Sequence, residues 1–362
     1  MALKPTFLKL HRWTGLSIGL LLMVQALTGV ALVFRDELER VVQPSLIVQV
    51  GPAALPVQAV LDAVPAAHPK AKINRADFPT QADQAVIVKW TQKEQRWLTA
   101  VDPYTGNIVR DGPQNSWPLE WVFNLHDQLL AGPAGETLIG IEGVVLVFLI
   151  VSGLIYWWPG RKRFRQGFRV KLDGSADIRW RTLHRAVGAG VSILLFVSAV
   201  TGVLMVWKDP FRDVLSTFTK VERKPSPKVA ELAGVPKQPV DRLIENARKS
   251  YDMAPLRQLR FSSGGRVVAV YLDSDSRTIR PDGTSQVYYN AYDGAVLDRY
   301  VAGEMAPASE MVDWLYPVHI GLWGGLFTKL LLMLTGLTLF GMGATGLWLW
   351  YSRTSKRRRR RA

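Results

Sequence analysis

Four of the five histidines occupy matching positions in a sequence pattern that occurs twice along the chain. His11 and His184 each follow a leucine, precede an arginine and open an apolar run, whereas His126 and His319 each stand five residues after a tryptophan and precede another apolar run. A neutral imidazole nitrogen is a common ligand of transition metals. The pattern therefore predicts two pairs of histidines, each of which could hold one metal.

The elements that position these histidines are four mainly apolar runs, at residues 14–34, 137–158, 186–207 and 328–351. Each run is long enough for the ~20 residues that cross a bilayer. The first run is longer than the apolar part of a usual signal peptide, so we expect an uncleaved helix. The sequence predicts a mainly α membrane protein with four transmembrane helices, arranged as two tandem repeats.

Positive charge, which gives the chain a net +15, gathers near the N-terminus, between Arg161 and Arg181, and in the tail from Arg353 to Arg361. By the positive-inside rule these three segments lie in the cytoplasm. We therefore expect a multi-pass protein of the bacterial inner membrane with both termini cytoplasmic. The basic tail could also bind anionic membrane lipid. Nucleic acid is not an expected partner, because no recognition module accompanies the basic residues.

The two long connections between apolar runs are expected in the periplasm, each as a small α+β module. Both modules show the same order of a helix, a strand and a hairpin that ends its turn in glycine. The expected elements are helix 57–64, strand 85–90 and hairpin 97–109 in the first module, and helix 240–251, strand 266–273 and hairpin 286–297 in the second.

The full expected division of the chain has eight segments. They are the N-terminus and first span 1–35, the first periplasmic module 36–136, the second span 137–158, a basic cytoplasmic loop 159–185, the third span 186–207, the second periplasmic module 208–327, the fourth span 328–351, and a basic cytoplasmic tail 352–362.

The chain contains no cysteine, which excludes cysteine-ligated iron–sulfur clusters, covalently attached c-type haem and thiol catalysis. The first and third spans run in the same direction, so His11 and His184 share one membrane depth, and His126 and His319 share the opposite one. Two opposed imidazoles suit the two axial positions of one haem iron. The sequence thus predicts two haem b groups, one for each pair.

Gly15 and Gly188 each follow a histidine by four residues and so share its helix face, where they could leave room for a flat macrocycle. Arg12 and Arg185 could meet haem propionates at the headgroup boundary, because guanidinium pairs well with carboxylate. Simple anchoring of these arginines in the cytoplasm is an equal alternative.

Other interpretations of single residues stay open. The histidines could be interfacial residues that touch headgroups, or they could bind zinc or copper, although no close acidic cluster supports such a site. His68 has no counterpart in the repeat and is expected in an exposed turn. Glu142 could contact a proton or quinol inside the second span, or extend its carboxylate to the outer surface. Repeated glycines could serve helix packing.

Several motifs resemble those of the PepSY-associated transmembrane family. They are the Leu-His-Arg-x-x-Gly opening, Val-Phe-Arg-Asp-Glu-Leu at 33–38, Ser-Gly-Leu-Ile-Tyr-Trp-Trp-Pro-Gly at 152–160 and the Asp-Pro-x-Thr-Gly turn at 102–106. The resemblance runs through nearly the whole chain. This family includes iron-regulated inner-membrane proteins and ferric-siderophore reductases, so the resemblance implies a haem reductase with His11, His126, His184 and His319 as iron ligands. The second repeat departs from the motifs at its helix ends, which puts the orientation of the modules in doubt.

The expected activity is oxidoreductase chemistry, in which electrons cross the membrane to a periplasmic acceptor, most simply the Fe(III) of a ferric siderophore, which is released as Fe(II). An unidentified cytoplasmic or quinol donor would supply the electrons. The main alternative is a non-enzymatic scaffold whose modules bind or restrain a periplasmic protein, and a small-substrate transporter is a third possibility.

Overall fold

The computed structural model describes residues 3–275 and 279–359, which form two compact units. The helical unit comprises the described parts of 1–35, 122–211 and 315–362, and the sheet unit comprises 36–121 and 212–314. The chain thus passes between the two units several times, although each unit has a core of its own.

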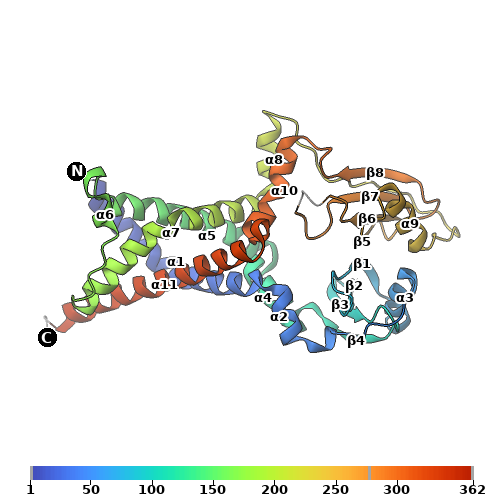
Figure 1. The fold of residues 1–362 in the computed structure, drawn as a ribbon, viewed down its shortest axis with the longest axis horizontal. Coiled ribbons are helices and arrows are strands. Elements are labelled where there is room, and N and C mark those ends of the chain that lie inside the picture. The colour runs from blue at the N-terminus through green and yellow to red at the C-terminus, as the bar shows by residue number, and fades with distance from the viewer. Residues whose placement is uncertain (1–2, 276–278, 360–362) are drawn as a thin grey trace. The chain divides into compact units, whose positions relative to one another are not determined.

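The helical unit contains four long apolar helices (Figure 1). They are α1 Leu3–Val33, α5 Gly132–Trp157, α7 Ala176–Val206 and α11 Gly325–Arg359. Each contains a stretch that is long and apolar enough to cross a membrane. The helices are several residues longer than the expected spans, so that His11 and His184 lie within α1 and α7 rather than before them.

These four helices form a ring in which α1 and α7 each pack against both α5 and α11. Leu22, Leu149 and Leu195 are among the residues at its centre. Two glycines at equivalent positions allow close helix contacts, because an added Cβ would lie 2.5 Å from Val203 at Gly143 and 2.5 Å from Val30 at Gly336. Small residues at helix contacts are usual where lipid provides no hydrophobic driving force. Both glycines therefore serve helix packing, one of the interpretations left open by the sequence.

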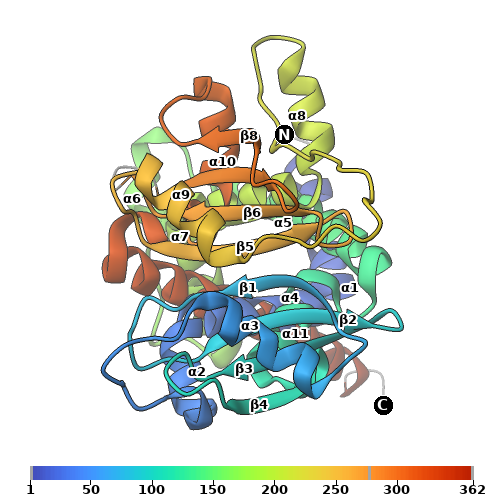
Figure 2. The ribbon, with the colours of Figure 1, turned by 90° about the vertical axis from the view of Figure 1, so that its right-hand side faces the viewer.

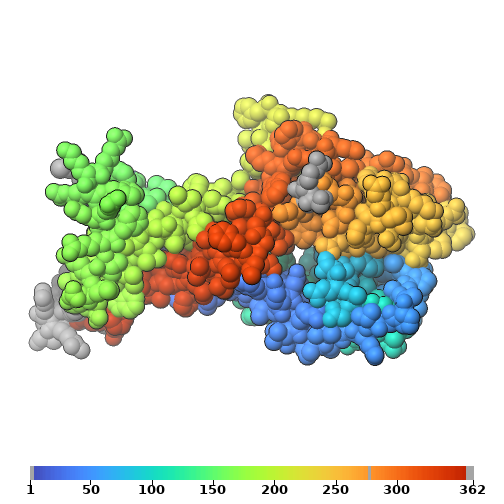
Figure 3. All heavy atoms as spheres, in the orientation of Figure 1, coloured from blue at the N-terminus to red at the C-terminus, as the bar shows by residue number. Residues whose placement is uncertain are grey.

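The outer surfaces of these helices are apolar, as lipid contact requires. Leu326, Phe327, Leu330 and Leu334 of α11 are all exposed, and α11 covers much of the visible face of the helical unit in Figure 3. The long apolar helices and their exposed apolar side chains indicate a multi-pass membrane protein.

Short helices flank the long ones. They are α2 Arg35–Val42, α4 Pro118–Gln128, α6 Phe164–Gly167, α8 Lys208–Ser216 and α10 Pro307–His319. His126 lies in α4 and is separated from α5 by a break in which Leu129 and Leu130 have positive φ values of 50° and 58°. His319 is the last residue of α10, and Gly321, with a φ of 75°, begins the turn that leads to α11. Both histidines are therefore held on short helices just before a span.

The sheet unit is built on one eight-stranded antiparallel sheet in the order β4-β3-β2-β1-β5-β6-β7-β8. The strands are β1 Lys72–Asp77, β2 Val86–Gln92, β3 Gln95–Val101, β4 Ile108–Pro113, β5 Leu256–Ser262, β6 Val267–Leu272, β7 Ser285–Asn290 and β8 Val296–Val301. The first four strands and the last four meet where Ala76 of β1 pairs with Leu259 of β5.

Two helices, α3 Val57–Ala67 and α9 Val240–Ser250, cover one face of this sheet (Figure 2). Val64 and Leu243 are fully buried in a core shared by both helices and both halves of the sheet. The helix starts are also linked, because the Asp241 carboxylate accepts hydrogen bonds from the backbone N–H groups of Val57 and Gln58. The Gln58 side-chain oxygen in turn accepts the N–H of Val240. Each helix thus caps the other.

The structure differs from the sequence expectation at three points. The strands 72–77 and 256–262 were not expected, and their pairing joins the segments described as separate modules into one unit. His68 begins a turn, as expected, because its carbonyl accepts the Ala71 N–H, but its side chain is half-buried rather than fully exposed. Its Nε2 lies 2.9 Å from the Asp111 carboxylate, and its ring lies 4.6 Å from that of Trp90. A carboxylate partner and an aromatic neighbour place it partly inside the sheet unit.

Candidate cofactor site in the helical unit

The four repeated histidines lie in two pairs inside the helical unit. His11 of α1 faces His184 of α7, with ring centroids 6.5 Å apart, and we refer to these two residues as pair A. His126 of α4 faces His319 of α10, with ring centroids 6.4 Å apart, and these form pair B. Each pair draws one histidine from each half of the chain, which is the combination that the sequence pattern predicts.

Each histidine also binds a hydroxyl group on a neighbouring helix. The hydroxyl belongs in every case to a serine or threonine that is followed by glycine, and we call these four dipeptides the hydroxyl–glycine pairs. The Nδ1 to hydroxyl distances are 3.0 Å for His11 and Ser152, 2.9 Å for His126 and Thr28, 2.8 Å for His184 and Thr345, and 3.0 Å for His319 and Thr201.

The hydroxyl contacts suit the histidine tautomer that carries its proton on Nδ1. The Thr28 hydroxyl donates to the Val24 carbonyl at 2.9 Å, and the Thr201 hydroxyl donates to the Val197 carbonyl at 2.8 Å. Ser152 and Thr345 make the same kind of bond to a carbonyl of their own helices. In the tautomer that carries its proton on Nδ1, each histidine can donate to the hydroxyl oxygen while the hydroxyl hydrogen is directed to the carbonyl of its own helix. The Nε2 lone pair is then available to a ligand.

The glycine of each hydroxyl–glycine pair lies directly against the ring. An added Cβ would lie 3.1 Å from the His126 Cε1 at Gly29 and 3.1 Å from the His319 Cε1 at Gly202. The corresponding distance at Gly153 is 3.3 Å to His11. At these three positions a larger residue would push the imidazole away from the helix backbone. Gly346 is looser, because its added Cβ would be 4.0 Å from His184.

The electrostatics of pair B favour neutral rings. Burial and, to a smaller extent, the nearby His319 lower the pKa of His126 to about 4, against a hydrogen bond with the Gln25 backbone that raises it. Burial also lowers the pKa of His319, against a backbone contact at Ser198. Both imidazoles of pair B are therefore uncharged near neutral pH, the state in which Nε2 binds a metal.

The residues fit a cofactor that brings most of its own ligands. Within residues 3–275 and 279–359, no group of three or more His, Cys, Asp or Glu side chains is placed to hold a metal ion. A bare zinc or copper ion would therefore find two protein ligands at each pair, fewer than such ions usually take. Two imidazoles bound at about 2.0 Å to a shared metal would have ring centres about 6 Å apart. The spacing in both pairs suits an iron whose four other positions are filled by a macrocycle.

The other predicted site residues have different surroundings. Gly15 lies against Leu149, and an added Cβ at Gly188 would be 2.6 Å from Met342, so these two glycines adjoin apolar side chains of the next helix. Arg12 is exposed, with its guanidinium 5.7 Å from the Trp13 ring. Arg185 donates to the Arg169 carbonyl at 3.2 Å, and its buried Nε has no hydrogen-bond partner within residues 3–275 and 279–359. Arg185 directly follows His184 of pair A in the sequence.

The sequence pattern contained the hydroxyl–glycine pairs but did not disclose their role. Thr28-Gly29 and Thr201-Gly202 recur at the far end of the histidine-bearing spans, where they resemble ordinary helix-packing positions. Their contact with a histidine 98 or 118 residues away appears only when the helices are placed together.

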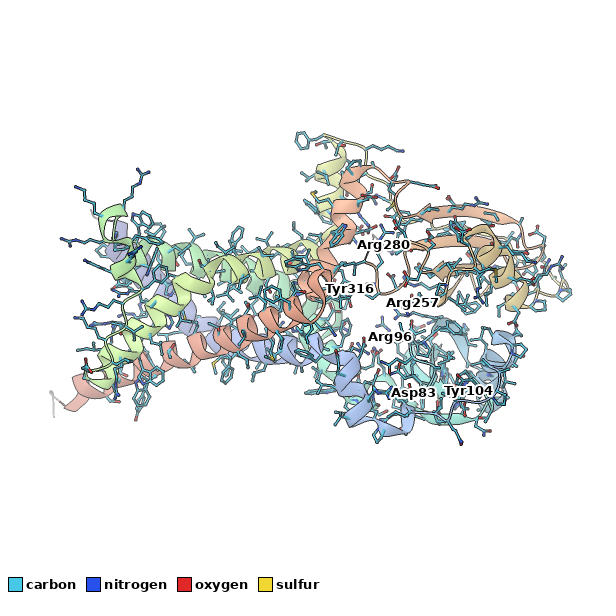
Figure 4. All side chains as sticks on the ribbon, viewed as in Figure 1. Asp83, Arg96, Tyr104, Arg257, Arg280 and Tyr316 are labelled. Atoms are coloured by element: carbon cyan, nitrogen blue, oxygen red, sulfur yellow. The ribbon has the colours of Figure 1, made fainter. Side chains whose placement is uncertain are left out.

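In the sheet unit, ionic groups pair with one another. Arg280, labelled in Figure 4, has a nitrogen 2.6 Å from the Asp313 carboxylate and donates to the Thr284 carbonyl at 3.1 Å. Tyr300 donates to the same carboxylate of Asp313 at 2.8 Å. These groups are buried, so they hold the sheet unit together and do not form an open site.

Comparison with known proteins gives the family. The model described as the PepSY-associated TM region matches residues 8–353, nearly the whole chain. The chain therefore belongs to this family. A search of curated proteins finds no match.

Proposed function

We propose that this PepSY-associated membrane protein is a di-haem b-type reductase that moves electrons across the inner membrane to a periplasmic acceptor. Pair A and pair B would each hold one haem iron through two Nε2 atoms. The acceptor would be ferric iron in a siderophore, which is reduced from Fe(III) to Fe(II) and released.

The observation that carries this proposal is the state of the four imidazoles. Each Nδ1 lies within hydrogen-bond distance of a hydroxyl that also contacts a backbone carbonyl of its own helix, an arrangement that suits the tautomer with Nε2 available to a metal. An imidazole that serves only to hold two helices together would not need its second nitrogen left available at a partner ring about 6 Å away. Four such cases in two facing pairs favour metal ligation over packing.

The topology is part of the same proposal. We take the chain as two tandem repeats, each with two spans and one periplasmic insertion, and with both termini in the cytoplasm. The basic segments at the N-terminus, at 161–181 and at 353–361 support this orientation. Pair A then lies on the cytoplasmic side and pair B on the periplasmic side.

The residues of the helical unit would bind the two haems and orient the imidazole ligands. Haem supplies one-electron chemistry when it is bound. The four histidines would fix the iron positions, and the hydroxyl–glycine pairs would hold the rings in one tautomer and at one distance from the helix backbone. Arg185 has a buried Nε available for a propionate. No acid or base is needed to reduce Fe(III) to Fe(II), because the change is the gain of one electron.

The donor and the acceptor would lie on opposite sides of the membrane. A cytoplasmic reductant or a membrane quinol would deliver electrons to the side of pair A. The ferric siderophore would dock on the periplasmic sheet unit, and reduction would weaken the hold of its hard oxygen ligands on iron.

The proposal is tested by a dithionite-reduced minus oxidised visible spectrum of the detergent-purified protein, with haem per chain measured by pyridine haemochrome. We expect b-type bands and about two haems per chain. His68→Ala is the matched control, since His68 belongs to the sheet unit and to neither pair. Anaerobic addition of a ferric siderophore to the reduced protein should restore the oxidised spectrum.

Two outcomes would contradict the proposal. A colourless protein from haem-replete cells would refute the proposed reductase activity and favour a scaffold that binds a periplasmic protein. A haem-loaded protein that stays reduced in the presence of ferric siderophores would show that ferric siderophores are not its electron acceptors.

A further inference from the structure

A carboxylate lies inside one of the membrane-spanning helices. Glu142 stands ten residues after the start of α5 and is 4% exposed. Among the residues that the structure describes, none forms a hydrogen bond with either carboxylate oxygen. An ionised carboxylate without partner or water is strongly disfavoured, and ionisable residues at membrane depth usually have a function.

The surroundings of Glu142 provide one polar group and no opposite charge. From α1, the side-chain amide of Gln25 faces the carboxylate. From α7, the residues beside the flanking glycines Gly140 and Gly143 are Val203, Val206 and Trp207, which are all apolar. Among the described residues, no charged or titratable side chain acts on Glu142 from the helices packed around it.

Gln25 connects this carboxylate with pair B. The Gln25 amide nitrogen donates to the His126 backbone carbonyl at 3.0 Å. The Gln25 side-chain oxygen is 3.5 Å from the Thr28 hydroxyl, which lies within hydrogen-bond distance of the His126 Nδ1. Gln25 therefore neighbours Glu142 on one side and is hydrogen-bonded to the backbone of His126 on the other.

The matching place in the second half of the chain has no carboxylate. Glu142 directly precedes Gly143, and the residue that precedes the equivalent packing glycine Gly336 is Thr335. Thr335 is 3% exposed and donates its hydroxyl to the Leu331 carbonyl. The carboxylate therefore occurs at this position only in the first half of the chain. It is not needed for the helix packing that both halves share.

An electron arriving at pair B would change the charge close to this carboxylate. A nearby positive charge favours an ionised carboxylate, and loss of that charge favours the protonated form. We propose that Glu142 is a proton-binding site coupled to the redox state of the iron held at pair B. One electron arriving at that iron is accompanied by one proton from water, which binds a carboxylate oxygen of Glu142. The proton leaves again when the electron passes to the acceptor.

This inference rests on the proposed haem ligation at pair B. It gives the site a second function, because each electron that enters the membrane interior there is neutralised by a proton. It also predicts that the two haems differ, since pair A has no such carboxylate among the contacts described for it.

The test is a spectroelectrochemical redox titration of the haem-loaded protein between pH 5 and pH 9. A one-electron couple that binds one proton loses about 59 mV of midpoint potential for each tenfold fall in proton concentration. In the wild type we expect the midpoint potential of one haem to fall with pH by this amount over part of the pH range. The midpoint potential of the other haem should not depend on pH. Glu142→Gln should abolish the slope while it keeps both haems. Glu136→Gln, which changes an exposed carboxylate of the same helix, should keep the slope.

A third variant assigns the slope to a pair. His319→Ala removes pair B, and the haem that stays should have a potential independent of pH. The inference is overturned if both wild-type potentials are independent of pH, if Glu142→Gln retains the slope, or if the slope persists in His319→Ala. Absence of haem from the wild type would instead overturn the proposed function, so the two failures are distinguishable.

Discussion

Replacing Thr201 by valine tests the role of the hydroxyl–glycine pairs most cleanly. Valine has nearly the shape of threonine but no hydroxyl, so the His319 Nδ1 would lose the hydrogen-bond partner that now lies 3.0 Å away. A buried donor left without a partner costs about 1 to 3 kcal/mol. The ring would also be free to rotate, which would misplace Nε2.

The effect on ligand binding follows from this loss. Removing the hydrogen-bond partner of a metal-bound histidine typically lowers affinity about 10- to 100-fold. That range corresponds to about 1.4 to 2.8 kcal/mol, which agrees with the cost of the unpaired donor. We therefore expect Thr201→Val to release one haem at least about tenfold faster than the wild type, while the haem at pair A is retained.

The assay is transfer of haem to an excess of apomyoglobin, followed by absorbance. Thr201→Ser keeps the hydroxyl and should behave as the wild type. Thr335→Val is the control for loss of a buried hydroxyl, because Thr335 bonds to a backbone carbonyl of its own helix and to no histidine. Equal release rates for Thr201→Val and the wild type would refute the role assigned to the hydroxyl.

Three further predictions concern other contacts. Gly29→Ala should lower haem content at pair B, because the new Cβ would lie 3.1 Å from the His126 ring, whereas Gly19→Ala has open space around it and should be neutral in the same haem assay. Asp241→Ala should lower the free energy of unfolding of the sheet unit by about 1 to 2 kcal/mol, since α3 loses two capping bonds, and an unchanged denaturation midpoint would contradict this. His68→Ala should also weaken the sheet unit, seen as a lower Tm, yet leave haem per chain unchanged; a loss of haem would show that His68 contributes to the site.

The membrane helices and the pairing of the histidines were predictable from the sequence, because both depend on periodic local patterns. Apolar length identifies a span without any knowledge of its neighbours. The direction of each span then places His11 and His184 at one depth. Both inferences follow from the length, order and direction of the apolar segments, without knowledge of the contacts between side chains.

The joined sheet was not predictable in the same way. The segment 72–77 has the sequence Lys-Ile-Asn-Arg-Ala-Asp, and Ala76 is the one residue of β1 that is fully buried. Such a strand lacks the alternation that reveals a half-buried strand. It becomes a central strand because β5, almost two hundred residues later, pairs with it. Contacts at that separation leave no local signal.

The surroundings of the histidines were also hidden. We expected Gly15 and Gly188 to make room beside the rings because they share a helix face with His11 and His184, and that role stays a prediction. The glycines in contact with rings are found on neighbouring helices, as at Gly153. Helical spacing describes one helix, whereas these contacts depend on how two helices are rotated against each other.

The central claim, that each histidine pair holds one haem, is tested most directly by haem stoichiometry in variants that break one pair at a time. The wild type should contain about two haems per chain, His11→Ala and His126→Ala about one each, and the double variant none. Two haems in either single variant, or loss of both haems from each of them, would contradict two independent pairs. A double variant that still binds haem would show that the ligands lie elsewhere.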